Sequence, residues 1–238
     1  MIKAFHLLRR SSDVGWYEFR SFVRNELVDN VVSGDGGELI DRVVTNYVLE
    51  HDFRPTTNRS GHRWHAVGEY YFADEERASR FLEKAQRGDR PWHRREIVDE
   101  SSFTLVDEQL IYDRGVEPGM PKIFGIFKNS LPAGQPMSRQ ETLRQWKQHQ
   151  RRMDDKGLGD LIEKFTRNIA LPDHHAADAR FDYDGASIVW CLSVEMAERL
   201  YKDEAIEQAV VPSGAAMGNE AADCVYLRTD WVEGFNRA

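Results

Sequence analysis

An internal repeat constrains the fold of this sequence more than any other feature. Three pairs of segments match in the same order, at spacings of 119 to 122 residues: 2–10 with 121–129, 37–49 with 159–171, and 72–82 with 192–202. In the second pair, five of thirteen positions are identical. The seam falls in Arg114–Pro121, where glycines and prolines interrupt regular structure. The repeat predicts two similar units, residues 1–116 and 117–238.

Each unit shows the same predicted order of elements, β-α-β-β-α-β. In the first unit, apolar and β-branched runs predict strands, and apolar residues at three- and four-residue intervals predict helices. The strands are expected at 2–9, 43–49, 64–72 and 108–113, and the helices at 16–31 and 74–86. In the second unit, Ser138 and Glu141 form a capping box, and 186–192 and 224–229 are expected strands. This order is the ferredoxin-like plan of an α+β protein.

The ferredoxin-like plan leaves one side of each sheet uncovered, because both helices lie on the other side. Two such halves in one chain can pack sheet to sheet as an intrachain α+β barrel. The space between the sheets can hold a small hydrophobic or aromatic ligand. A single unit would need a second molecule to cover its open sheet face, whereas in a tandem chain the other half covers it. A homodimer is therefore an open alternative rather than a requirement.

The composition excludes several classes of function. The 238 residues carry 40 acidic and 32 basic side chains, and this acidic balance argues against general nucleic-acid binding. No apolar stretch is long enough to span a membrane, and Lys3 and His6 interrupt the N-terminal apolar run, so we expect a cytoplasmic protein. No phosphate-binding glycine motif occurs, and the histidines of 62–65 and 173–175 lack convincing metal-site spacing. No cofactor and no metal are expected.

The third predicted strand carries the candidate site. Strict alternation places His65, Glu69 and Tyr71 on the face toward the other half, and Trp64 and Tyr70 on the helix-covered face. An imidazole or carboxylate in an apolar cavity shifts its pKa and can act as an acid or a base. We therefore predict Glu69 or His65 as the base.

The remaining candidates come from other strands. His6 is the predicted partner acid, and Tyr47 joins Tyr71 as a hydrogen-bonding wall residue. A parallel alignment of the two halves places Val189 at the position of Glu69 and Cys191 at that of Tyr71, so the second half is expected to supply an apolar wall for substrate binding. Buried histidines and tyrosines are also common as purely structural, hydrogen-bonded groups, and that alternative remains open.

The chain resembles a tandem member of the EthD-like family within the dimeric α+β barrel group. In the first half the resemblance lies in Met1–Arg10, Tyr17–Phe19, Trp64–Phe72 and Asp99–Phe103; in the second it lies in Ser138–Glu141, Trp146 and Asp184–Gly185. It implies paired half-barrels, small organic substrates from degradation or polyketide pathways, and usually no cofactor. The family histidine that follows the first-helix Phe by eight residues has no counterpart, since Leu27 and Gln150 occupy those positions.

Two classes of function remain open from the sequence. The first is a cofactor-independent enzyme of the lyase or isomerase type that abstracts a proton from a small hydrophobic or aromatic molecule; cofactor-free oxygenation is a related alternative. The second is a non-catalytic binding or accessory protein of a degradation pathway. A purely structural dimerisation module is a weaker third reading.

Overall fold

A computed structural model describes residues 1–51, 64–87, 96–127, 157–175, 185–202 and 224–237, with single helical positions between 140 and 155. The strands are β1 (Ile2–Arg10), β2 (Arg42–His51), β3 (Ala66–Phe72), β4 (Val98–Asp113), β5 (Lys122–Phe127), β6 (Lys164–His175), β7 (Gly185–Trp190) and β8 (Cys224–Asn236). The helices are α1 (Trp16–Ser21), η1 (Phe22–Leu27), α2 (Val28–Ser33), η2 (Gly37–Leu39), α3 (Glu75–Arg87), η3 (Leu158–Leu161) and α5 (Val194–Lys202). The predicted capping box of Ser138 and Glu141, as well as Trp146 and Gln150, lies outside the described residues.

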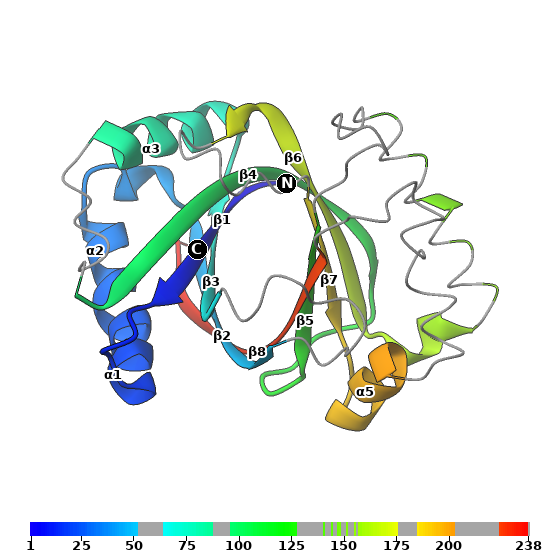
Figure 1. Cartoon of the computed structure of the whole chain (residues 1–238). Coiled ribbons are helices and arrows are strands. Elements are labelled where there is room, and N and C mark those ends of the chain that lie inside the picture. The colour runs from blue at the N-terminus through cyan, green and yellow to red at the C-terminus, as the bar shows by residue number, and fades with distance from the viewer. Residues whose placement is uncertain are drawn as a thin grey trace, which may run out of the picture.

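All eight strands form one closed antiparallel barrel (Figure 1). Their order around the barrel is β1-β3-β2-β8-β5-β7-β6-β4. The expected barrel is present, but as one closed sheet rather than as two sheets packed face to face. The outer strands of one half pair with those of the other, β2 with β8 and β4 with β6, so hydrogen-bonded ladders join the halves on both sides. Closure removes the free sheet edges. Strand β4 begins ten residues earlier than the sequence predicts, at Val98, whereas β3 begins two residues later, at Ala66.

Helices cover the outside of the barrel on two sides, with α1, α2 and α3 against one part and α5 against another (Figure 1). The predicted helix at 16–31 is found as a continuous run whose middle turns, Phe22–Leu27, have π-helical hydrogen bonding. Asp74 caps α3 as predicted, because its carboxylate accepts a hydrogen bond from the Arg77 backbone N–H at 2.8 Å. None of the described helices meets the length and hydropathy needed to cross a membrane.

Alternation along the strands divides the buried side chains into outer and inner groups. The outer groups pack beneath the helices; Ala4, Tyr70 and Phe81 belong to the larger one. The inner group fills part of the barrel and consists of Phe5, Leu7, Val48, Trp64, Val67, Val106, Phe124, Ile126, Ala186, Ile188 and Trp190. The other part of the interior is polar, and the candidate site lies there.

Candidate functional site in the polar half of the barrel

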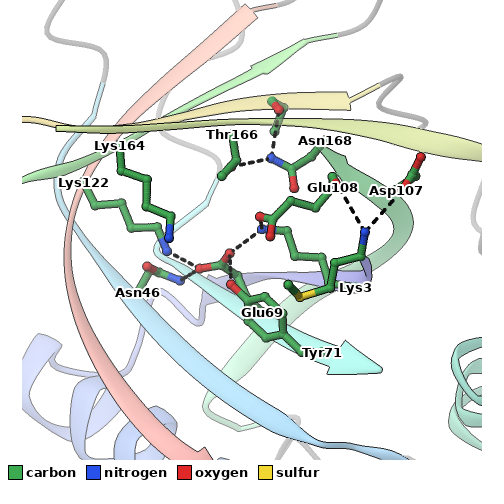
Figure 2. A network of polar contacts seen from close by, with 12 residues as sticks. Lys3, Asn46, Glu69, Tyr71, Asp107, Glu108, Lys122, Lys164, Thr166 and Asn168 are labelled. Atoms are coloured by element: carbon green, nitrogen blue, oxygen red, sulfur yellow. Dashed lines mark hydrogen bonds and ion pairs between the residues drawn. The ribbon is translucent and has the colours of Figure 1, made fainter. Parts of the chain in front are cut away.

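Glu69 of β3 is the centre of a buried polar network (Figure 2). One carboxylate oxygen, Oε2, accepts hydrogen bonds from Lys3 Nζ at 2.8 Å and from the Tyr71 hydroxyl at 3.1 Å. The other oxygen, Oε1, accepts from Asn46 Nδ2 at 3.0 Å and from Lys122 Nζ. A single carboxylate, fully buried, thus serves two ammonium groups from strands β1 and β5.

The pKa values of the network follow from how many partners each group has. Burial alone would raise the pKa of Glu69, but Lys122 and Lys3 outweigh it and hold that pKa well below its usual range. Burial likewise opposes the charge on Lys3, but Glu69, Tyr71 and Glu108 together raise the pKa of Lys3. A second carboxylate contact, from Lys3 Nζ to Glu108 Oε2 at 2.5 Å, further stabilises the charged form of Lys3. Lys3 and Glu69 are therefore fixed in their charged forms.

Of the two lysines bonded to Glu69, Lys122 holds its proton less tightly than Lys3. Burial lowers the pKa of Lys122 to about 8, and attraction to Glu69 only partly offsets that effect. Its Nζ lies 4.9 Å from the ring centre of Phe124 and 4.8 Å from that of Trp190, so aromatic rings replace the water that a surface ammonium would have. Lys122 therefore gives up its proton more readily than an ordinary lysine, and the free amine is a base and a nucleophile.

Lys122 also faces a cavity of about 790 Å³ at the polar end of the barrel. The residues that line it, mixing aromatic, aliphatic and charged side chains, are Met1, Arg42, Val44, Tyr71, Glu108, Asp113, Gly115, Val116, Pro118, Lys122, Lys164, Trp190, Trp231, Val232 and Glu233. Two ion pairs stand in its wall, Arg42 with Glu233 at 3.0 Å and Lys164 with Asp113 at 2.6 Å. The volume suits a small organic molecule of a few rings.

The site repeats part of its geometry on opposite sides of the barrel. Lys3 pairs with Tyr71 between β1 and β3, and Lys122 pairs with Trp190 between β5 and β7. Asn46 donates to the Val67 carbonyl oxygen at 2.9 Å, and Asn168 donates to the Ala186 carbonyl oxygen at 3.2 Å. The symmetry is broken at the centre, because Glu69 pairs with Phe5 whereas Ile188 takes the corresponding place beside Phe124.

Of the predicted site residues, the structure brings Glu69 and Tyr71 together inside the barrel, and only Tyr71 of the two lines the cavity. His6 lies on the opposite, helix-covered face of β1. Its Nδ1 is 2.9 Å from the Tyr70 hydroxyl, and its ring stacks on Phe103 at 3.9 Å between centres. The predicted pairing of His6 as an acid with Glu69 is therefore not found.

His65 is also turned away from the barrel interior. The chain bends at His65 before β3 begins at Ala66, so the strict alternation assumed from the sequence fails at this end. His65 Nδ1 accepts a hydrogen bond from the Arg10 backbone N–H at 2.9 Å, and its ring contacts Trp16 of α1 edge-on. Trp64, expected beneath the helices, packs inside the barrel instead.

Three predicted wall residues face outward, beneath the helices. Tyr47 belongs to the larger outer cluster, and the guanidinium of Arg20 lies over its ring. Val189 and Cys191 pack in the cluster under α5. The predicted inward position of Val189 and Cys191 was wrong because it rested on a spacing of 120 residues between β3 and the corresponding strand β7. The strand registers correspond at 119, and a shift by one residue exchanges the two faces.

Sequence reasoning missed the two lysines, Asn46 and Glu108. A signal for the first three was present in the repeat itself: Lys3 and Lys122 occupy the same place in the first matched pair, and Asn46 and Asn168 are identical in the second. Polar residues retained at inward positions of both units are candidates for the interior. In the described part of the chain, no three His, Cys, Asp or Glu side chains gather as a metal site would require.

Comparison with known proteins supports the fold. The sequence matches no protein-family profile and no curated protein. Among solved structures, an anthrone oxidase-like protein matches at TM-score 0.61 and 11% identity, over 100% of this chain and 94% of that one. A candidate monooxygenase from Fusobacterium nucleatum subsp. nucleatum matches at TM-score 0.54 and 9% identity, over 100% and 98%. One from Lactobacillus acidophilus NCFM matches at TM-score 0.51 and 8% identity, over 98% and 96%.

These likenesses, all at low identity, concern the fold alone. The chain has a mixed α+β fold with eight antiparallel strands in one closed barrel, and these solved structures share its fold.

Proposed function

We propose that this protein is a cofactor-independent enzyme that removes a proton from a small hydrophobic or aromatic molecule bound in the cavity, with Lys122 as the base. The observation that supports this most directly is the position of Lys122. Its side chain is almost fully buried and lines the cavity, and its amine shares the Glu69 carboxylate with the Lys3 ammonium. A base whose pKa lies near the working pH combines a usable free fraction with proton affinity.

Lys122 fits this role better than Glu69, the base favoured by the sequence. Glu69 is fully buried behind the cavity wall and accepts four hydrogen bonds, two of them from ammonium groups. Its lowered pKa makes it a weak proton acceptor. The role that suits Glu69 is to position the Lys122 amine and to stabilise the ammonium that forms when Lys122 takes a proton.

The cavity wall indicates the kind of substrate. Tyr71, Trp190 and Trp231 offer flat apolar surfaces, whereas Arg42 and Lys164 can donate hydrogen bonds to a carbonyl or phenolic oxygen. A substrate with an acidic C–H or O–H group next to such an oxygen fits both features. Once its proton is on Lys122, the resulting carbanion or enolate can isomerise, cyclise or eliminate a leaving group.

Cofactor-free oxygenation is the second candidate, since the same deprotonated intermediate can react with molecular oxygen. The names of the similar structures, an anthrone oxidase-like protein and two candidate monooxygenases, favour this alternative. Both candidates share the proton-abstraction step and differ in whether oxygen is consumed.

Anthrone and 2-tetralone are suitable probes, because each has an acidic methylene next to an aromatic system. Under nitrogen in D2O, NMR should show enzyme-dependent exchange of the methylene hydrogens, and Lys122→Met should reduce its rate by roughly 10²–10⁴-fold. Lys84→Met is the matched control, since Lys84 lies on α3 outside the barrel in surface ion pairs. Admitting air and measuring oxygen uptake then separates oxygenation from isomerisation.

The outcomes distinguish the function classes. Exchange no faster than in buffer for both probes, or equal exchange by Lys122→Met, would contradict the proposed base. If calorimetry then showed that the probes bind without any turnover, the non-catalytic binding protein would be the better description.

We also propose that the barrel derives from the duplication of one ferredoxin-like unit, with residues 1–116 and 117–238 as its two copies, and that the EthD-like resemblance reflects this ancestry. Three observations support this. The strand orders β4-β1-β3-β2 and β8-β5-β7-β6 correspond. Lys3 with Lys122 and Asn46 with Asn168 occupy corresponding places. Residues 114–121 connect the two sets without a helix or strand.

A further inference from the structure

We propose that Lys122 captures aldehydes or ketones covalently, as an imine formed inside the cavity. This inference goes beyond proton abstraction and rests on the proposed function in one respect, because both need the Lys122 amine free of its proton and facing the cavity. It assigns the substrate class more narrowly, to molecules that carry a carbonyl group.

Lys122 differs from Lys3 and Lys164 because it combines access to the cavity with shielding from bulk water. Lys3 is fully buried, is held by Glu69 and Glu108, and does not line the cavity. Lys164 lines the cavity, but its side chain is 27% exposed and ion-paired with Asp113. Only Lys122, of these three, is both shielded from water and open to the cavity.

The surroundings of the Lys122 amine favour condensation. The ring centres of Phe124, Trp190 and Trp231 lie within 4.8–5.9 Å of Nζ. Their apolar surfaces limit the water that would reverse the reaction. Amines activated by desolvation or by neighbouring cations form imines in other proteins, and the Lys3 ammonium contacts the same carboxylate as Lys122.

The cavity also offers groups for the carbonyl oxygen. Lys164 Nζ lies 5.6 Å from the ring centre of Trp190, the ring that Lys122 also contacts, so both lysines of the cavity wall lie near one indole. The Lys122 nitrogen adds to the carbonyl carbon, its two N–H protons are transferred to the carbonyl oxygen, the C–O bond breaks, and one water molecule leaves. The product is a C=N bond to Lys122; when protonated, the iminium keeps a positive charge beside Glu69.

Reductive trapping tests the proposal on the wild-type protein. Benzaldehyde and sodium cyanoborohydride are added at pH 8, where hydride reduces any iminium to a stable benzylamine. Peptide mass mapping should then find Lys122 modified at least roughly tenfold faster than Lys84, because its pKa of about 8 leaves far more free amine than an ordinary lysine has. Modification of Lys122 no faster than that of Lys84, or preferential modification of Lys164, would overturn the proposal.

A matched variant and a ligand competition sharpen the result. Lys122→Arg keeps the charge beside Glu69 but cannot form an imine, so the fast-reacting site should vanish from the peptide map. Anthrone in excess should slow the trapping of Lys122 and leave that of Lys84 unchanged if both probes share the cavity. Should Lys122→Arg fail to fold, the map of the wild-type protein decides alone.

The two proposals fail separately. Lys122-dependent deuterium exchange without trapping refutes covalent capture and leaves the base role intact. Trapping at Lys122 without any exchange supports covalent capture and refutes proton abstraction as the function tested here.

Discussion

Two lysines share one fully buried carboxylate, and this fixes the energetics of the site. Taking a charge out of water costs several kcal/mol unless partners compensate it. Glu69 compensates Lys3 and Lys122 at once, with Glu108 as a second partner for Lys3. Any change at Glu69 therefore leaves two buried ammonium groups short of negative charge.

The first prediction concerns Glu69→Gln. This variant should lose about 3–5 kcal/mol of unfolding free energy, measured by urea denaturation, because it breaks a buried ion network by removing one partner. The control is Glu38→Gln on the surface, where the ion pair with Lys84 is exposed and should contribute at most about 1 kcal/mol. Adding Lys122→Met to Glu69→Gln should restore part of the loss, and a double variant no more stable than Glu69→Gln would argue against the shared-charge account.

The second prediction concerns pH. Lys122 acts as a base only after losing its proton, so the rate of deuterium exchange should rise with pH and reach half its maximum near the pKa of about 8. Attraction to Glu69 raises the pKa of Lys122, so removing that carboxylate should lower it and move the midpoint to lower pH. A midpoint unchanged in Glu69→Gln, or a rate that falls with pH through this range, would mean that another group carries the reaction.

At the scale of elements, the alternation of side chains between the two faces of β3 is predicted correctly within the strand and wrongly just before it begins. From Ala66 to Phe72 the predicted faces of β3 are correct, with Glu69 inside and Tyr70 outside. At His65 the chain bends, and the predicted faces of Trp64 and His65 are exchanged. Sequence periodicity assumes a regular backbone and carries no information about where the strand begins.

The third prediction concerns the turn that leads from α2 toward β2. A Cβ built on Gly37 would lie 2.0 Å from the backbone oxygen of Val32, and backbone cannot move aside as a side chain can. Gly37→Ala should therefore destabilise the protein by about 1–3 kcal/mol or more in urea denaturation. Gly15→Ala is the matched control, since nothing lies within 4 Å of its Cβ position, and it should change stability by less than about 0.5 kcal/mol. Equal losses in both variants would show that the contact is not the cause.

At the scale of the whole molecule, the repeat carried most of the predictable information. It implied the order of elements and a barrel-like enclosure. It could not show that β2 pairs with β8 and β4 with β6, because pairing between distant edges leaves no local pattern in the sequence. The site was predictable at Glu69 and Tyr71, which alternation placed correctly. Lys122 was missed because a lone lysine in a strand ordinarily indicates a surface position.

The fourth prediction follows from the ladders that join the halves. Because both seams are hydrogen-bonded, the two halves should unfold together in a single urea transition. The test compares far-UV circular dichroism with tryptophan fluorescence, which reports on both halves because each carries three of the six tryptophans. Coincident curves are expected, and two separated transitions would show that each half is stable without the other.

The packed half of the barrel also limits how a small molecule can move through the interior. Within the described residues, the void beside Phe5, Leu7 and Ile126 holds only about 10 Å³, too little for an organic molecule to pass. Among the described residues, a small molecule in the chamber around Lys122 therefore has no passage through this packed half. Product and substrate would occupy the same chamber, so accumulated product should compete directly with substrate for binding.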